Sequence, residues 1–344
     1  MEQKRVKYID LLKAILVLNM ILAHTFQLIL GMSIEPINST NRIMIYINLT
    51  TFSGFLFCFG YSSYIAYLSK DKKEVILKLL RNIIRLLFAF YISGISYYII
   101  NTTRVNIFVI SKIFLLLYIP GFSEFLASFM MLNLFTLIFF NFIKKVIENK
   151  KALMVCICIS LILTFIPYQF FKHPWISLII GTTETCFPIL QYMSLFLMGM
   201  YCAKYKPKFE LKTLLFTFLC FAIFEIGVCN NWEVVTRFPP KLLWIIGSYF
   251  FIYVYYYASI YICKKYEGNK ILECINFIGR DTLIFLLISN IILFTVRKFT
   301  FYKNVSFIET ISIYLLTINI CYISAGIKYI LVNQKKLKNT VNTF

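Results

Sequence analysis

Long apolar runs recur along the whole chain, and short polar segments separate them. Most runs reach the roughly 20 residues that a helix needs to cross the hydrocarbon core of a bilayer. Short loops between such runs make consecutive helices antiparallel neighbours. We therefore predict an all-α, polytopic membrane protein in which residues 1–344 form one integral membrane domain. The pattern predicts ten membrane-spanning helices, over residues 9–31, 43–68, 82–101, 122–143, 152–171, 185–203, 211–229, 241–263, 276–297 and 306–331.

One further apolar stretch, residues 105–119, is weaker than the others and contains Lys112. It is shorter than a bilayer-spanning helix requires. We predict that it forms an interfacial or re-entrant segment before the fourth span. If it crosses the bilayer instead, the topology shifts by one span.

The distribution of cations along the chain predicts its orientation. The chain has 35 Lys and Arg residues and 15 Asp and Glu residues, for a formal net charge of +20. About three quarters of the cations fall at the two chain ends and in alternate loops between the predicted spans. Because cytoplasmic loops are rich in Lys and Arg, we expect both termini in the cytoplasm, an even number of spans and a multi-pass location in the plasma membrane. No soluble segment offers a basic face for nucleic acid, so we expect no nucleic-acid partner.

Three ionisable residues, Asp10, Lys13 and His24, lie within the first apolar run. Such side chains are costly in hydrocarbon and therefore indicate a functional site. At about 100° per residue they fall on one stripe of a helix, with His24 about 16 Å further along the axis than Lys13. Asp10 and Lys13 are close enough on a helix surface to pair. We take these three residues as the candidate catalytic group.

Other kinds of chemistry find no support in the sequence. The 10 Cys residues are scattered, most of them in apolar runs, and no Cys and His residues share metal-ligand spacing. We expect the cysteines to be small packing residues and predict no metal site. The chain has no nucleophile-elbow serine, no zinc-peptidase motif and no phosphate-binding glycine loop, which argues against a hydrolase, a zinc peptidase and an ATPase.

Four segments carry a resemblance to a known family. In the first segment, a basic residue, Lys13, is separated by ten residues from a histidine, His24. The other three segments are FSGFLFCFGY over 52–61, KLLRNIIRLLFAFY over 78–91 and FIGRDTLI over 277–284. In this order, and over nearly the whole chain, they resemble the acyltransferase 3 family of integral membrane O-acyltransferases.

The chain departs from the family pattern at four places. The family usually has Arg where this chain has Lys13, and a Ser where it has Phe59. Residues 124–126 are Glu-Phe-Leu where the family often has Trp-Phe-Leu. A histidine often follows the late Gly-Lys-Asn-Ser element of the family, and Asn290 stands there in this chain. If that histidine takes part in the chemistry, the change alters the activity or the acceptor.

The resemblance implies an acyltransferase that transfers groups other than amino-acyl groups. The expected donor is acyl-CoA, with acetyl-CoA as the expected co-substrate, and no cofactor is bound permanently. The resemblance places the donor on the cytoplasmic side and the acceptor, a hydroxyl of a cell-surface or lipid-linked glycan, on the outer side. Imidazole can accept a hydroxyl proton near neutral pH, so we predict His24 as the general base, a role that the resemblance also implies.

Basic residues near the cytoplasmic side are candidates for binding the donor. Lys13 could contact the phosphates or the pantetheine amides of coenzyme A. Arg81 and Arg85, one helical turn apart, suit its phosphates. All three could instead be positive-inside anchors. Arg280 and Asp281 could pair with each other and cap the ninth span.

Three residues are candidates for binding the acceptor substrate. Tyr61 could line the cavity, Glu124 could orient His24 or an acceptor hydroxyl, and Asn290 could hydrogen-bond in the core. Each also has a plain structural alternative, in packing or at the membrane interface. Glu225, another acid in an apolar run, needs a partner.

Two other functions remain open at this point. The chain could be a non-catalytic exporter of a polysaccharide or lipid-linked sugar, or a family member that binds a glycan without acylating it, as Asn290 suggests. An enzyme needs the imidazole of His24 for turnover, whereas an exporter would tolerate Gln at this position.

Overall fold

The computed structural model describes residues 5–32, 41–166, 173–180, 187–300 and 305–341, and within these ranges every regular element is a helix. A π-helical turn over Tyr64–Leu68 extends the second helix. The helices are α1 (Lys7–Ile29), α2 (Arg42–Ser63), α3 (Lys72–Asn101), α4 (Ile107–Phe114), α5 (Glu124–Ile138), α6 (Phe140–Glu148), α7 (Lys150–Ile162), α8 (Pro174–Ile179), α9 (Met193–Tyr205), α10 (Leu211–Cys229), α11 (Leu242–Lys265), α12 (Lys270–Arg280), α13 (Thr282–Thr300) and α14 (Phe307–Val341).

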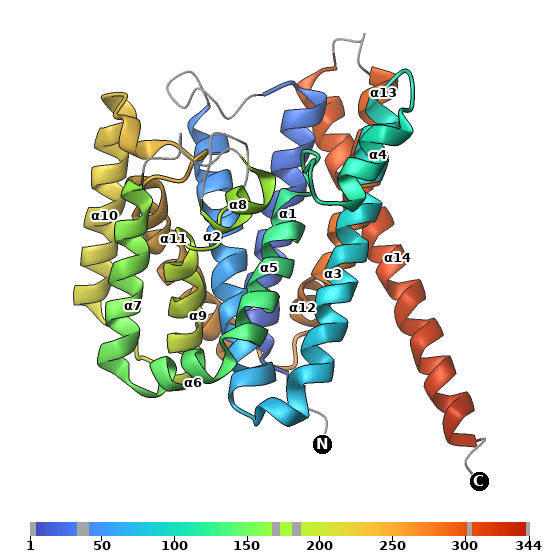
Figure 1. The fold of residues 1–344 in the computed structure, drawn as a ribbon. Coiled ribbons are helices and arrows are strands. Elements are labelled where there is room, and N and C mark those ends of the chain that lie inside the picture. Colours follow the sequence, from blue (N-terminus) through green and yellow to red (C-terminus); the bar gives the residue numbers. More distant parts are fainter. Residues whose placement is uncertain (1–4, 33–40, 167–172, 181–186, 301–304, 342–344) are drawn as a thin grey trace.

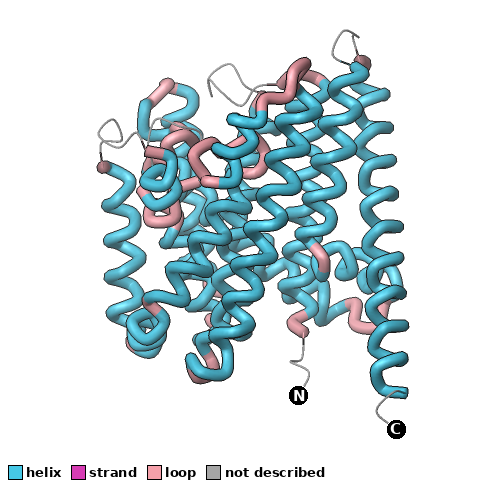
Figure 2. The backbone as a smooth tube through the Cα atoms, turned by 45° about the vertical axis from the view of Figure 1, so that its right-hand side comes forward, coloured by secondary structure: helices cyan, strands magenta, loops and turns pink. Residues whose placement is uncertain are grey.

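The long helices run side by side between two ends of the molecule (Figures 1 and 2). Helix α1 begins and α14 ends at the same end, which we call the proximal end; the opposite end is the distal end (Figure 1). Helix α1 occupies the centre, in contact with α2, α11, α12, α13 and α14. The start of α1 and the end of α14 therefore lie on one side of the molecule, and the cytoplasmic placement of both chain ends stays a prediction.

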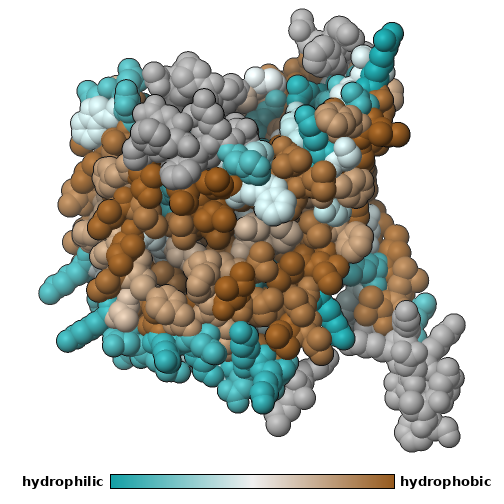
Figure 3. Space-filling view, in the orientation of Figure 1, coloured by the Kyte–Doolittle hydropathy of each residue, from teal (hydrophilic) through white to brown (hydrophobic). Residues whose placement is uncertain are grey.

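The surface has the composition of a membrane protein. On the face shown in Figure 3, apolar side chains form a belt across the middle of the molecule, and hydrophilic side chains gather toward its two ends. Seven helices of the described ranges are long and apolar enough to cross a membrane. An eighth span results if α5 and α6, which are bent by 83° at the break between them, count as one.

The predicted number of ten spans is not confirmed. The predicted spans over 152–171 and 185–203 overlap α7 and α9, which have 13 residues each, and residues 167–171 and 185–186 of these spans lie outside the described residues. The predicted ninth span, 276–297, begins too early. Residues up to Arg280 form the separate helix α12, which packs against α1, and the span itself begins at Thr282.

The segment 105–119 is not among the helices long enough to cross a membrane, which agrees with the prediction of an interfacial or re-entrant segment. Its only helix, α4, has 8 residues and lies at the distal end (Figure 1). The Tyr91 hydroxyl donates to the Phe114 carbonyl oxygen over 2.9 Å, and the Trp175 indole donates to the Leu115 carbonyl oxygen over 3.2 Å. Ile107 is 82% exposed, which suits a short helix resting at a membrane interface.

Glycines set the distance between helices at two crossings near the site. A Cβ added at Gly199 of α9 would overlap the Phe57 carbonyl oxygen of α2. A Cβ at Gly279 of α12 would overlap the Asp10 carbonyl oxygen of α1. Small residues permit such close backbone contact between membrane helices. The contact at Gly279 holds Arg280 beside the proximal part of α1.

Opposite effects on stability are expected from alanine at two helical glycines. Gly199→Ala should lower the free energy of unfolding by about 1–3 kcal/mol, because the added methyl group overpacks a closed helix crossing. Gly326→Ala, where an added Cβ would meet no atom within 4 Å, should raise it by about 0.5–1 kcal/mol. Thermal unfolding of the purified protein in detergent measures both. Equal shifts in the same direction would contradict the packing described for α2 and α9.

Candidate active site

His24 lies in a cavity of about 450 Å³ toward the distal end, which we call the distal cavity. Helices α1, α2, α13, the start of α5 and the loop before α11 enclose it. Its polar lining includes Gln27, Asn48, Thr51, Glu124, Arg237 and Arg297, and its aromatic lining Phe52, Phe55, Phe122, Phe125, Phe187 and Phe238.

The imidazole of His24 is held by one side chain from a distant part of the chain. Its Nδ1 lies 2.9 Å from Oδ1 of Asn290, which belongs to α13 and is fully buried. The ring of Phe122 packs edge-on against the imidazole, with 4.8 Å between the ring centroids. The position of the imidazole is therefore fixed by contacts from two other segments.

The hydrogen bonds of Asn290 determine the tautomer of His24. The Nδ2 atom of Asn290 donates to the Phe122 carbonyl oxygen over 3.1 Å and to Ser93 Oγ over 3.2 Å. A carbonyl oxygen can only accept, so the amide NH₂ faces Phe122 and the amide oxygen faces His24. The neutral imidazole then carries its proton on Nδ1 and keeps the lone pair of Nε2 available. That lone pair is what a general base requires.

A second cavity of about 300 Å³ lies toward the proximal end, and we call it the proximal cavity. Its lining contains four cationic side chains, Arg5, Lys13, Arg85 and Arg280, and one acid, Asp281. The Lys13 ammonium donates to Ser62 Oγ over 2.9 Å. The excess of positive charge suits a phosphorylated ligand.

The two cavities adjoin. Met20, Phe55 and Phe125 line both of them, and we call these three residues the partition. On α1, Lys13, Met20 and His24 fall within about 40° of one helix face, so one stripe leads from the basic cavity through the partition to the imidazole. A ligand bound in the proximal cavity therefore lies one layer of side chains away from His24.

Asp10 and Lys13 do not form the ion pair that their spacing allows, since the Lys13 ammonium donates to Ser62 Oγ instead. Both residues still share a third cavity of about 330 Å³, together with Tyr61 and Arg280. Helix α12 comes close to α1 here, which a sequence-based helical wheel of α1 alone cannot include. Asp10 therefore lies beside the proximal cavity rather than near His24.

The structure separates the two arginines predicted to bind coenzyme A. Arg85 lines the proximal cavity, whereas Arg81 is exposed and lines neither cavity. The predicted pair of Arg280 and Asp281 does not form. Asp281 Oδ1 instead accepts from Lys328 Nζ over 2.7 Å and lies 3.9 Å from Arg85 Nη2, while Arg280 lines the cavity.

The three predicted acceptor-binding residues lie in different places. Glu124, the first residue of α5, lines the distal cavity. Asn290 contacts His24 rather than lining a cavity. Tyr61 lies toward the proximal end, where its hydroxyl is 2.6 Å from that of Tyr8. Only Glu124 is thus placed on a cavity wall shared with the imidazole.

Sequence reasoning missed Arg237 and Arg5 as residues of the two cavities. Arg237 belongs to the loop between α10 and α11, and its Nη1 donates to Asn48 Oδ1 over 3.1 Å. The available signal for Arg237 was its position in a loop on the side of the membrane where the sequence places few Lys and Arg residues. Arg5 lies before the first helix and was counted only among the orientation signals.

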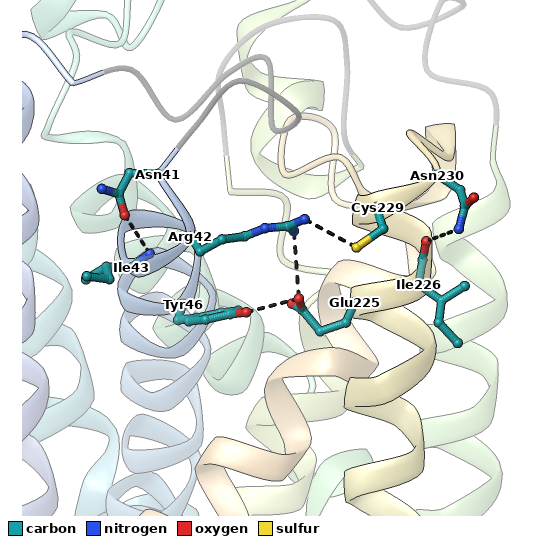
Figure 4. Close-up of polar contacts among 8 residues, drawn as sticks. All are labelled: Asn41, Arg42, Ile43, Tyr46, Glu225, Ile226, Cys229 and Asn230. Atoms are coloured by element: carbon teal, nitrogen blue, oxygen red, sulfur yellow. Dashed lines mark hydrogen bonds and ion pairs between the residues drawn. The ribbon is translucent and has the colours of Figure 1, made fainter.

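Glu225 has partners away from this site, between α10 and the start of α2 (Figure 4). Its Oε2 accepts from the Tyr46 hydroxyl over 3.0 Å and lies 3.7 Å from Arg42 Nη1. Arg42 Nη2 also lies 3.3 Å from Cys229 Sγ. This cluster joins α2 to α10 and supplies the partner that an acid in an apolar run needs.

Helices long and apolar enough to cross a membrane enclose an oriented imidazole and an adjoining basic cavity, and this is the architecture of a multi-pass membrane protein. Comparison with known proteins identifies the family: the model of the acyltransferase 3 family, described as an acyltransferase domain, matches residues 6–326. The chain belongs to this family and is a membrane acyltransferase. No curated protein and no solved structure matches it.

Proposed function

We propose that this protein is an O-acyltransferase of the plasma membrane that moves an acetyl group from acetyl-CoA to a hydroxyl of a cell-surface or lipid-linked glycan, with His24 as general base. The observation that carries the proposal is the imidazole fixed by Asn290 in a cavity that shares its wall with a basic cavity. The proximal end faces the cytoplasm, in agreement with the positive-inside distribution of Lys and Arg.

The donor binds from the proximal end. The phosphates of coenzyme A contact the cations of the proximal cavity, Arg5, Arg85 and Arg280, and Lys13 contacts the phosphates or the pantetheine amides. The pantetheine arm follows the stripe of α1 and brings the thioester to the partition. The acceptor occupies the distal cavity, with one hydroxyl at Nε2 of His24.

The transfer then needs one base and no covalent enzyme intermediate. Nε2 takes the proton of the acceptor hydroxyl while its oxygen attacks the thioester carbonyl carbon. A C–O bond forms, the C–S bond breaks, and coenzyme A leaves as a thiolate that receives the proton from the imidazolium. Asn290 accepts from Nδ1–H throughout and so stays the positioning residue of the base.

Membranes that contain the protein test the proposal against the exporter alternative. Wild-type membranes given radiolabelled acetyl-CoA should transfer label into glycan, and membranes with His24→Ala at equal protein level should not. Label in neither sample, together with glycan export that persists in His24→Ala, would favour a non-catalytic exporter. Equal label in both samples would remove His24 from the chemistry.

A matched pair of variants on α3 tests the donor site. Arg85→Gln should raise KM for acetyl-CoA by about ten- to a hundredfold, because a cation that contacts a phosphate contributes roughly 1.5–3 kcal/mol. Arg81→Gln, the same change one turn away on an exposed side chain, should leave KM nearly unchanged. Steady-state kinetics over a range of acetyl-CoA concentrations measures both constants. A larger effect at Arg81 than at Arg85 would contradict the proposed donor site.

A further inference from the structure

We infer that the acceptor is an anionic glycan, one of whose carboxylate or phosphate groups is bound by Arg237 in the distal cavity. The inference rests on the proposed function for the acceptor being a glycan, and it adds the charge of that glycan. Four observations support the inference. The guanidinium of Arg237 is held by several contacts, Arg237 lies on the distal side of His24, a second arginine lines the same cavity, and other cations are few at this end.

The guanidinium of Arg237 is held in place before any ligand arrives. Asn48, which is buried, donates its Nδ2 to the Met44 carbonyl oxygen over 2.8 Å, so its Oδ1 points toward Arg237 and accepts from Nη1. The guanidinium also lies over the rings of Phe187 and Phe238, 5.1 Å and 4.6 Å from their centroids. A planar guanidinium fixed in this way offers a preorganised fork for an oxyanion.

Arg237 lies on the distal side of the imidazole. Its partner Asn48 is seven residues from the partition residue Phe55, which is about 10 Å along α2. His24 is four residues from the partition residue Met20, which is about 6 Å along α1. Arg237, His24 and Glu124 nevertheless all line the distal cavity, so the three groups surround one volume. Arg237 is thus placed for a group of the acceptor beyond the reacting hydroxyl, not for the thioester oxygen at the partition.

A second arginine of the distal cavity also lies on its distal side. Arg297 is seven residues beyond Asn290 on α13, which is about 10 Å further from the partition than the residue that holds His24. Among the described lining residues there are two arginines and one acid, Glu124, so the described part of the wall carries an excess of positive charge. An acceptor with negative groups would be attracted to this wall, and a neutral glycan would gain nothing from it.

The cations of this cavity are not part of a generally basic surface. Only about a quarter of the Lys and Arg residues belong to segments at the distal end, and two of these line this one cavity. Positive-inside anchoring explains cations at the proximal end and predicts few at the distal end. Ligand charge therefore accounts for Arg237 and Arg297 better than membrane anchoring does.

Three acceptor compounds test the inference on the purified full-length protein in nanodiscs. The first is an oligosaccharide of alternating glucuronate and N-acetylglucosamine, and the second is the same oligosaccharide with its carboxylates reduced to alcohols. The third is a glycerol-phosphate oligomer, which separates phosphate from carboxylate. Equilibrium binding is measured for each compound at low and high salt, and acetyl transfer from acetyl-CoA is measured in parallel.

Wild type should bind at least one anionic compound about ten- to a hundredfold more tightly than the neutral oligosaccharide, as expected for a charge-assisted contact. Arg237→Gln should abolish this preference, and Arg237→Lys should retain part of it. Lys298→Gln, a change at an exposed cation that does not line the cavity, should leave the preference intact. Equal binding of all three compounds by wild type, or a preference that survives Arg237→Gln, would overturn the inference.

Failure of the inference and failure of the proposed function give different results. If acetyl moves equally well to the neutral and the anionic oligosaccharides, the enzyme is an acyltransferase without charge selectivity. A different result is that the anionic compounds bind preferentially through Arg237, but acetyl-CoA is neither used to acetylate any compound nor hydrolysed. The anion-binding site would then be confirmed, and the transferase reaction would not.

Discussion

His24→Gln is expected to lower the rate constant of acyl transfer by about two to four orders of magnitude, the usual contribution of a general base. Glutamine keeps a hydrogen-bonding side chain of similar length but cannot accept the hydroxyl proton. The dissociation constant for acetyl-CoA should not change, because the proposed donor site lies on the other side of the partition. Single-turnover transfer measures the rate constant, and titration of acetyl-CoA measures the binding.

The second histidine of the chain is the matched control. His173 is exposed and its Nδ1 accepts from the Trp175 backbone N–H over 3.3 Å, at the start of α8. His173→Gln makes the same change of residue type outside both cavities and should leave transfer at the wild-type rate. A loss of transfer in His173→Gln as large as that in His24→Gln would show that the effect is not specific to the proposed base.

Asn290→Leu is expected to lower kcat by about ten- to a hundredfold with little change in KM for acetyl-CoA, in line with the loss of a residue that orients a catalytic group. Leucine has about the size of asparagine but cannot accept from Nδ1–H, so both tautomers of His24 become populated and the ring is free to turn. The variant also leaves the Phe122 carbonyl oxygen without its Asn290 partner, which is expected to reduce stability.

The split between the two kinetic constants separates a positioning role from a purely structural one. A structural defect would lower the amount of folded protein, which a thermal unfolding measurement detects, and would leave kcat per folded molecule unchanged. A positioning role lowers kcat per folded molecule. Wild-type kcat in folded Asn290→Leu protein would show that the orientation of His24 does not depend on this hydrogen bond.

The sequence was sufficient to predict the stripe on α1, because the spacing of Lys13 and His24 along one helix is a local property. The period of the helix places both on one face whatever surrounds them. Long apolar runs likewise predicted an all-helical membrane protein, and the alternation of cations along the loops predicted that both termini share one side. These signals depend on residues that are close in sequence or on composition.

Contacts between distant segments could not be predicted in this way. Asn290 contacts His24 although the two residues are 266 positions apart in the sequence. From the sequence alone, Asn290 was a candidate for a hydrogen bond in the core or for binding the acceptor. Arg280 reaches the proximal cavity only because Gly279 allows α12 to touch the backbone of α1. Hydropathy also predicted spans at 152–171 and 185–203, but it could not show that the described helices there have only 13 residues.

The central claim is that an acyl group passes from the proximal cavity to an acceptor at His24 in the distal cavity. Sealed right-side-out membrane vesicles, loaded with radiolabelled acetyl-CoA and carrying glycan on their outer surface, test it most directly. Wild-type protein should place label on the outer glycan, and His24→Gln at the same protein level should place almost none. Label on the outer glycan at the same rate in both, or label only when acetyl-CoA is supplied from outside, would contradict the account.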